Sequence, residues 1–338
     1  MTELIVHEGH DGWLFLTGGT NFVTTLYERN GGHLPDANLR RWRDAILERK
    51  RRCDALGVAY AHLVAPEKLT IYGHKQATPL VNVDLAPAIR LQQLFHGDAR
   101  AAGWVDLVWP MRERRDDVEL YWRSDTHWTP EGSLLAYHLL CEALQLAPNQ
   151  GLAHRPCITL HKIMDLGGKV DPPRWEEIRE IDWIANAQRI YANAVVRILE
   201  DPVHGGDIHV GAHVVYRNEE APNKVRILLF GDSFAGVGHD RLTAQLAETA
   251  SELVFVWSAN VDWRLVERVK PDIVITQIAE RYMALAPNDR FNLWRAVLSQ
   301  LIKAQRRETA AKWRRARARW DQRDKNRRAD NQRAKNGP

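Results

Sequence analysis

Two short segments of this sequence contain residue types that can perform nucleophilic chemistry together. Gly-Asp-Ser at 231–233 follows an apolar run directly, and Asp125 and His127 lie two positions apart far upstream. A serine that follows a buried parallel strand is presented at the carboxyl edge of the sheet, where open α/β sheets place their sites. Residues two apart in an extended segment project to the same side, so Asp125 can orient His127 to take a proton from Ser233.

Each segment also has a structural explanation when it is considered alone. Serine and aspartate are favoured helix caps, and residues 235–250 after Ser233 have a helical pattern. A lone histidine more often belongs to the core, so His127 is informative because Asp125 and Ser233 accompany it. A helix that begins directly after Ser233 would direct the Ser233 amide towards an oxyanion, and this favours catalysis.

The elements that must position these residues alternate between helical and strand patterns. Thr129 is a favoured N-cap and Pro130 a favoured first helical residue, so a helix is expected just after His127. Apolar periodicity predicts helices at 35–56, 85–95, 130–144, 262–269 and 291–302, and strands at 58–65, 104–108, 225–230, 253–257 and 271–278. This alternation predicts an α/β fold with a central, mostly parallel sheet. Lys68, which follows the first of these strands, is interpreted as a solvated surface residue.

Residues 150–222 are the least regular part of the sequence, because many turn residues interrupt them. We interpret this segment as an insertion or lid near the site, with a helix at 174–191. Its three histidines, His204, His209 and His213, have the side chain that metals most often bind. The glycines around them argue against a helix that would bring them to one face, so no metal site is predicted.

The charge pattern divides the chain into a catalytic domain at 1–302 and a basic tail at 303–338. The tail has 14 Lys/Arg and 4 Asp/Glu, a net charge of +10, whereas residues 1–302 carry a net charge of −6. Three cysteines without metal spacing suit a reducing compartment. With no signal peptide or membrane-spanning run in the sequence, we expect a cytoplasmic protein, or a periplasmic one if a leader has been removed.

The tail is expected to be a helix that fades into disorder. Trp313 and Trp320 lie seven residues apart among arginines, which suits a basic amphipathic helix on an anionic surface. An acidic polymer is the other partner that such a helix fits, whereas nucleic acid is not expected. A solvated basic extension is the simplest interpretation of the same residues.

Four motifs, in their order along the chain, resemble a known family. They are Asp-Gly-Trp-Leu-Phe-Leu at 11–16, Asp-Thr-His-Trp at 125–128, Gly-Asp-Ser-Phe at 231–234, and Pro-Asp-Ile-Val-Ile at 271–275 with Glu280-Arg281 after it. Over about residues 10–300 the sequence resembles the SGNH-hydrolase-like domain of alginate O-acetyltransferases, the AlgX/AlgJ type. The resemblance implies an SGNH-like three-layer α/β fold with a permuted order of catalytic motifs and an irregular insertion.

The resemblance also implies a reaction and the residues that carry it. Ser233 is expected to take an acetyl group as nucleophile, with His127 as its base and Asp125 orienting the histidine. The acetyl group then passes to a hydroxyl of a polysaccharide or oligosaccharide, and polysaccharide-assembly proteins are the expected partners. No bound cofactor is expected, and the acetyl donor is either acetyl-CoA or an acyl carrier partner.

Further residues are assigned to the site as hypotheses. The oxyanion donors are expected to be the Ser233 amide and one of three others, Gly19, Asn21 or Tyr282. Tryptophan rings stack on sugars, so the expected substrate contacts are Trp122 and Trp128, together with Arg281. The same nucleophile serves a carbohydrate acetylesterase with water as acceptor, and a non-catalytic glycan-binding or scaffold SGNH domain is the remaining alternative.

Overall fold

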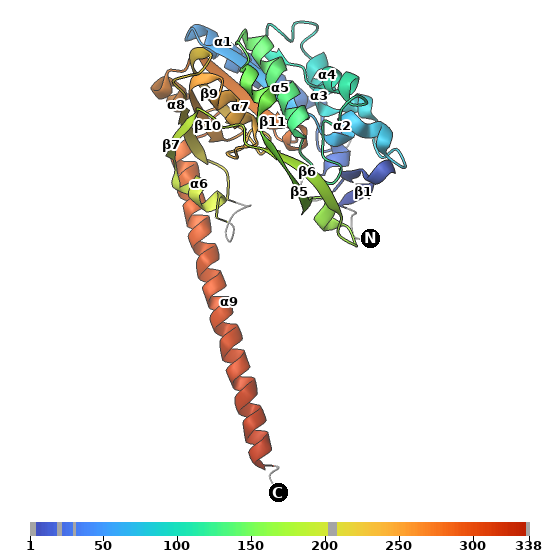
Figure 1. Cartoon of the computed structure of the whole chain (residues 1–338), viewed down its shortest axis with the longest axis vertical. Coiled ribbons are helices and arrows are strands. Elements are labelled where there is room, and N and C mark those ends of the chain that lie inside the picture. The colour runs from blue at the N-terminus through green and yellow to red at the C-terminus, as the bar shows by residue number, and fades with distance from the viewer. Residues whose placement is uncertain (1–4, 19–21, 30–31, 202–207, 336–338) are drawn as a thin grey trace.

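A seven-stranded sheet lies at the centre of the computed structural model, which describes residues 5–18, 22–29, 32–201 and 208–335 (Figure 1). Its strand order is β4 (Trp104–Val105), β3 (Ala59–Ala65), β11 (Ile273–Ala279), β9 (Asn223–Gly231), β10 (Ala250–Trp257), β8 (His213–Arg217) and β7 (Gln188–Ala192). The strands from β4 to β10 are parallel, and β8 and β7 continue the sheet in the antiparallel sense. The mostly parallel sheet predicted from the sequence is confirmed.

Helices cover both faces of this sheet and form the outer layers of the expected three-layer fold. α1 (Asp36–Ala55) and α5 (Pro130–Leu144) both pack on β3, and α7 (Leu242–Ala247) packs on β10. Every residue of β11 is buried, as are the last five residues of β9, which explains why both strands are mainly apolar; the polar exceptions in β11, Thr276 and Gln277, are buried as well. The remaining short helices are α2 (Lys68–Tyr72), α3 (Pro87–Gln93), α4 (Val108–Arg114), α6 (Ala194–Leu199) and α8 (Trp263–Val269).

The segment after Ser233 differs from the predicted helix at 235–250. A loop occupies the first part of this range, α7 begins only at Leu242, and Ala250 already starts β10. Gly236 adopts a φ of +54°, a left-handed conformation that a continuing right-handed helix excludes. Ser233 therefore lies in a tight turn and not at a helix N-terminus, so the helix-based argument for its amide was wrong.

The predicted helix at 174–191 was also wrong, because two strands occupy this range. β6 (Trp175–Ile181) pairs with β5 (Cys157–Ile163) in an antiparallel hairpin, and β7 joins the edge of the central sheet. Both strands depend on partners outside their own sequence, which local periodicity cannot reveal. Residues 150–222 thus contribute the β5–β6 hairpin as well as two strands of the main sheet, β7 and β8.

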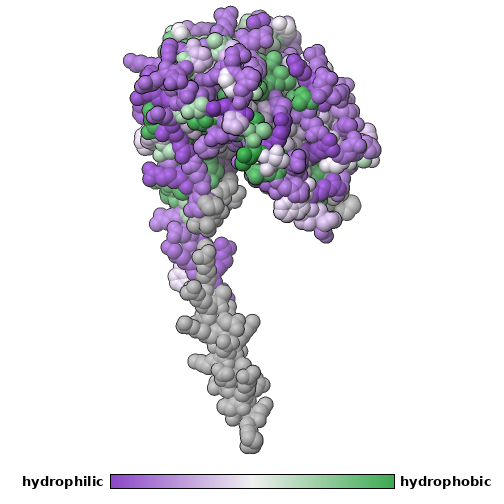
Figure 2. Space-filling view, in the orientation of Figure 1, coloured by the Kyte–Doolittle hydropathy of each residue, from purple (hydrophilic) through white to green (hydrophobic). Residues whose placement is uncertain are grey.

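The last described element is one long helix, α9 (Leu293–Lys335), which projects away from the domain in Figure 1. Its first turns pack against α6, and the helix continues through most of the basic tail. The surface of the domain and of the first described turns of α9 is largely hydrophilic in the view of Figure 2. Within the described part of the chain, no helix is both long and apolar enough to cross a membrane.

Candidate active site

Ser233 is held at the carboxyl end of β9 by the side chain of its neighbour, Asp232. The buried carboxylate of Asp232 accepts hydrogen bonds from the Phe234 amide at 3.0 Å and the Gln277 side-chain amide at 2.9 Å. Gly231 lets this turn close, because a Cβ atom there would lie 2.9 Å from the Gln277 side-chain oxygen. The turn is therefore fixed between β9 and β11, and it presents a partly exposed Ser233.

His127 and Asp125 lie in the loop that precedes α5. Thr129 caps this helix by accepting a hydrogen bond from the Gly132 amide at 3.2 Å, and Pro130 is its first residue, as predicted. Because α5 packs on β3 and on α7, its fixed N-terminus also fixes the end of the preceding loop.

The three polar side chains form one hydrogen-bonded chain. His127 Nε2 lies 2.9 Å from Ser233 Oγ, and His127 Nδ1 lies 2.8 Å from Asp125 Oδ1. The same Asp125 oxygen accepts a hydrogen bond from the His127 backbone amide at 2.7 Å. The structure thus brings together the serine, histidine and aspartate that the sequence singled out, in the geometry that serine nucleophiles use.

The electrostatics of Asp125 favour its ionised form. Burial raises the pKa of this carboxyl, but the charge and the hydrogen bonds of His127 outweigh burial, so the pKa lies well below its ordinary value. An ionised Asp125 accepts a hydrogen bond from the N–H of His127 Nδ1, which leaves Nε2 without a proton and facing Ser233.

A cavity of about 220 Å³ opens beside His127, between its loop and the β5–β6 hairpin. The residues of the loop that line it include Trp122, Asp125, His127 and Trp128, and the hairpin contributes Lys162, Ile178, Arg179 and Glu180. Its tryptophan rings and paired charges give it both apolar and polar walls, as small-molecule sites have. Trp128 packs edge-on against Phe234, with ring centroids 4.8 Å apart, so it also links the loop to the Ser233 turn.

The model of the family described as "SGNH hydrolase-like domain, acetyltransferase AlgX" matches residues 6–189, more than half of the sequence. The chain belongs to this family. The matched range includes Asp125 and His127 and ends before Ser233, so the fold itself supplies the position of the serine beside them.

Several solved structures share this fold. The O-acetyltransferase domain of Pseudomonas putida AlgJ aligns with a TM-score of 0.50 at 16% identity, over 87% of this chain and 99% of that domain. Bacillus cereus PatB1 with a sulfonyl adduct aligns with a TM-score of 0.58 at 13% identity, over 82% of this chain and 94% of the PatB1 chain. Pseudomonas aeruginosa AlgX aligns with a TM-score of 0.51 at 16% identity, over 86% of this chain and 65% of the AlgX chain.

No curated protein matches the chain. At these identities the solved structures establish the fold alone, and with the family match they confirm the predicted SGNH-like architecture of the AlgX/AlgJ type.

The remaining residues assigned from the sequence lie in different settings. Gly19 and Asn21 fall outside the described residues. Tyr282 is exposed beside Arg281, and no hydrogen bond between it and Ser233 is found among the described residues. Within the same part of the chain, no acceptor is paired with the Ser233 amide, which leaves this donor available to an oxyanion.

Arg281 is buried and is not among the residues that line the cavity. Its buried guanidinium pairs with Glu67 at 2.6 Å and donates to the Thr126 carbonyl at 3.3 Å. It also lies 5.5 Å from the centre of the Phe234 ring, which in turn contacts the His127 ring. In this arrangement Arg281 connects β11 to the loop of Asp125 and His127.

Sequence reasoning missed the side chains that hold this loop from outside. In the hairpin, the Glu176 carboxylate accepts hydrogen bonds from the backbone amides of Arg123 and Ser124, both at 2.8 Å. Asp165, in the turn before β6, accepts from the Thr126 amide at 2.9 Å and from its hydroxyl at 2.8 Å. Glu176 and Asp165 are far from the loop in sequence, so no local pattern could reveal that they bind it.

The interpretation of Lys68 as a solvated surface residue was also wrong, because its side chain is buried. Lys68 begins α2, shortly after β3 ends at Ala65. Its place after a buried parallel strand could have indicated from the sequence that it lies near the site.

The two described histidines of the segment at 150–222 that were considered as metal ligands lie against different aromatic rings. The His213 ring packs near Tyr191, the His209 ring packs near Trp257, and His204 lies outside the described residues. Across the described ranges, no group of three or more His, Cys, Asp or Glu side chains is arranged to hold a metal ion.

Proposed function

We propose that this chain is a serine-dependent O-acetyltransferase that moves an acetyl group to hydroxyls of a polysaccharide or other glycan. The observation that carries the proposal is the hydrogen-bonded chain from Ser233 through His127 to Asp125. Membership of an acetyltransferase family supports acyl transfer as the reaction class. The glycan acceptor is supported by the tryptophan-lined cavity beside His127, because apolar ring faces stack on sugars.

In the first half of the reaction, Ser233 Oγ attacks the acetyl carbonyl carbon while His127 Nε2 takes the hydroxyl proton. The tetrahedral oxyanion accepts a hydrogen bond from the Ser233 amide. It collapses to acetyl-Ser233 as the bond to the donor's leaving group breaks, and His127 returns the proton to that group. Asp125 stabilises the imidazolium that exists between the two proton transfers.

The second half reverses these roles with a new nucleophile. A sugar hydroxyl in the cavity attacks acetyl-Ser233, and His127 removes its proton. The bond between the acetyl carbon and Ser233 Oγ breaks, and the proton passes from His127 to the serine oxygen. The products are an acetylated sugar and the free enzyme. The donor is acetyl-CoA or an acyl carrier partner, and neither requires a bound cofactor.

Intact-mass spectrometry tests the proposal directly. Wild type and Ser233→Ala are incubated with 4-nitrophenyl acetate, with and without a panel of neutral and acidic oligosaccharides. We expect one acetyl adduct on wild type, none on the variant, and faster loss of the adduct to a sugar that becomes acetylated. A sulfonyl fluoride provides a second probe, and we expect it to label wild type at Ser233 only.

The other outcomes separate the alternatives. Loss of the acetyl group to water at the same rate with or without sugar would identify an acetylesterase. Absence of any adduct, with wild type and His127→Ala behaving alike, would identify a non-catalytic glycan-binding domain. Full activity in Ser233→Ala would overturn both enzymatic interpretations.

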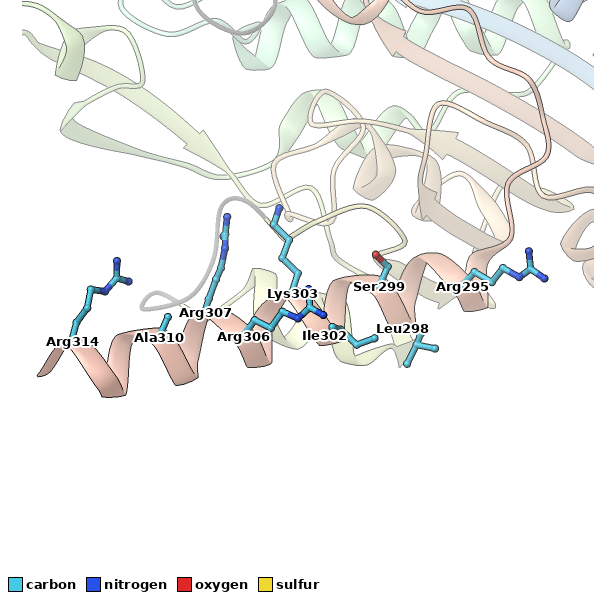
Figure 3. Close-up of a pocket in the computed structure, with 9 residues that line it drawn as sticks. All are labelled: Arg295, Leu298, Ser299, Ile302, Lys303, Arg306, Arg307, Ala310 and Arg314. Atoms are coloured by element: carbon cyan, nitrogen blue, oxygen red, sulfur yellow. The ribbon is translucent and has the colours of Figure 1, made fainter. Parts of the chain in front are cut away.

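We further propose that α9 docks on an anionic lipid surface. Figure 3 shows five cationic and two apolar side chains along the first half of this helix: Arg295, Leu298, Ile302, Lys303, Arg306, Arg307 and Arg314. Trp294, Leu298, Ile302 and Trp313 are all exposed. Binding of an acidic polymer requires only the cations. Exposed tryptophan and aliphatic side chains beside the cations favour a lipid surface, because such side chains insert into the headgroup region of a bilayer.

A further inference from the structure

Lys68 is a buried cation next to the site that the reaction described above does not use. Its ammonium donates three hydrogen bonds to backbone carbonyls, those of Trp122 at 2.8 Å, Arg123 at 2.8 Å and Asp125 at 2.7 Å. An ammonium has three N–H donors and no acceptor, so these carbonyls use its full capacity. All three carbonyls belong to the loop that carries Asp125 and leads to His127.

The N-terminal motif at 11–16 encloses this cation. The Lys68 ammonium lies 5.7 Å from the centre of the Trp13 ring and 5.8 Å from that of Phe15. Between these two aromatic residues, the Leu14 amide donates to the Arg123 carbonyl at 2.9 Å, so β2 (Leu14–Leu16) also binds the loop. Hydrogen bonds in such a water-poor setting are stronger than in solvent, and losing one is correspondingly costly.

Burial lowers the pKa of Lys68 from its ordinary 10.5 to about 8. Nearby carboxylates oppose this effect by favouring the charged form: those of Asp125, Asp165, Glu176 and Glu67. At neutral pH the side chain is therefore charged and offers all three donors to the loop.

We propose that Lys68 is a positioning residue for the reaction. Its three hydrogen bonds fix the backbone at 122–125, so that the Asp125 carboxylate and the His127 ring keep their alignment with Ser233. This inference rests on the proposed function, since it assigns Lys68 to the same site. It also explains why the motif at 11–16, which supplies no group to the reaction, lies against the loop.

A neutral Lys68 would hold the loop less well. The amine keeps two N–H donors and directs a lone pair at the third carbonyl oxygen, so we expect kcat to fall as pH rises through about 8. Stability moves the other way. Between pH 8 and 10.5 the unfolded chain retains a proton that the folded chain loses, so the contribution of Lys68 to the free energy of unfolding rises with pH.

The test compares Lys68→Met and Lys68→Arg with wild type, with Lys50→Met as the matched control. Lys50 pairs with Asp54 on the surface of α1 and lies in a different element from the site. For acetylation of an oligosaccharide we expect kcat of Lys68→Met to fall about 100-fold with little change in KM, the effect of a displaced catalytic group. We expect Lys68→Arg to keep more activity and to lose the decline above pH 8, because a guanidinium stays protonated there.

Hydrogen exchange provides a readout that does not depend on turnover. The amides of residues 122–127 should exchange faster in Lys68→Met than in wild type, while those of β9 stay unchanged. A Lys68→Met enzyme with wild-type kcat and exchange would overturn the proposal. If Lys68→Met does not fold, the pH dependence of Lys68→Arg tests the proposal instead. A decline of kcat above pH 8 in Lys68→Arg equal to that of wild type would exclude deprotonation of Lys68 as its cause and overturn the proposal.

Failure of the proposed function is separately visible. An active Ser233→Ala enzyme would remove the acetyl-serine mechanism, and the exchange rates at 122–127 would still test whether Lys68 holds the loop.

Discussion

Asp125 decides what His127 can do, because it accepts two hydrogen bonds from that one residue. One comes from the backbone amide and the other from ring nitrogen Nδ1. The first fixes the carboxylate relative to the chain, and the second fixes the orientation and tautomer of the ring. His127 Nε2 then faces Ser233 as an acceptor, which is the arrangement that general-base catalysis needs.

Replacing Asp125 with Asn tests this role at nearly constant size. The asparagine amide favours the tautomer in which His127 Nε2 carries the proton and cannot accept one from Ser233. We therefore expect kcat to fall by about 10⁴-fold, as removal of this charge does in other serine enzymes, with KM much less affected. Steady-state acetylation kinetics measure both quantities, and a kcat within about tenfold of wild type would contradict the assignment.

The lowered pKa of Asp125 also predicts how stability depends on pH. Because its folded-state pKa lies below the ordinary 3.8, this group contributes stability that is present above pH 3.8 and is lost as pH falls below it. Wild type should therefore lose stability in acid more steeply than Asp125→Asn, which has no proton to take up at this position. Denaturant unfolding at a series of acidic pH values measures the difference, and parallel curves would disprove it.

At the scale of elements, the β5–β6 hairpin both walls the cavity and holds the loop. Its inner side chains line the cavity beside His127, and Glu176 binds the amides of two residues in that loop. The hairpin and the loop are consequently coupled, so a change in the hairpin should be felt at the reacting groups.

Glu176→Ala tests this coupling, with the adjacent and exposed Glu177→Ala as control. Loss of hydrogen bonds from a carboxylate to two backbone amides should reduce the free energy of unfolding by about 2 kcal/mol. We also expect a lower kcat for Glu176→Ala, since the loop that carries His127 loses an anchor. Thermal unfolding and kinetics measure the two effects, and equal behaviour of both variants would show that the hairpin does not hold the loop.

At the scale of the whole molecule, negative and positive charge are separated along the chain. Residues 1–302 carry a net charge of −6 and contain the hydrogen-bonded site, whereas residues 303–338 carry +10. α9 begins against the domain and then leaves it (Figure 1), so its exposed face can contact a surface while the site stays in solution.

Charge reversal on α9 tests the docking proposal in the full-length chain. We expect the double variant Arg306→Glu, Arg314→Glu to lose binding to phosphatidylglycerol vesicles while kcat on a soluble acceptor stays unchanged. Reversal of two exposed α1 residues, Arg40→Glu and Arg41→Glu, is the matched control. Co-sedimentation at low and high salt measures binding, and equal binding to phosphatidylcholine or to a polyuronate would exclude an anionic bilayer as the partner.

Much of the site was predictable because its signals are local. An apolar strand followed by Gly-Asp-Ser, and an Asp-x-His segment before a Thr-Pro helix start, identify Ser233, His127 and Asp125 from short windows of sequence. Their catalytic roles remain the proposal made above. Alternating helices and strands gave the parallel sheet for the same reason, since each element is recorded in its own periodicity.

The tertiary structure decided the rest. The strand at 175–181 and the loop after Ser233 were predicted as helix, because strand pairing and a left-handed Gly236 depend on neighbours or conformations that local pattern does not record. Lys68 was interpreted as a surface residue because lysine is rarely buried. Only the fold brings three backbone carbonyls within hydrogen-bond distance of its ammonium. The sequence by itself therefore identified the serine, histidine and aspartate that the fold brings together, whereas long-range packing determined which groups hold them in place.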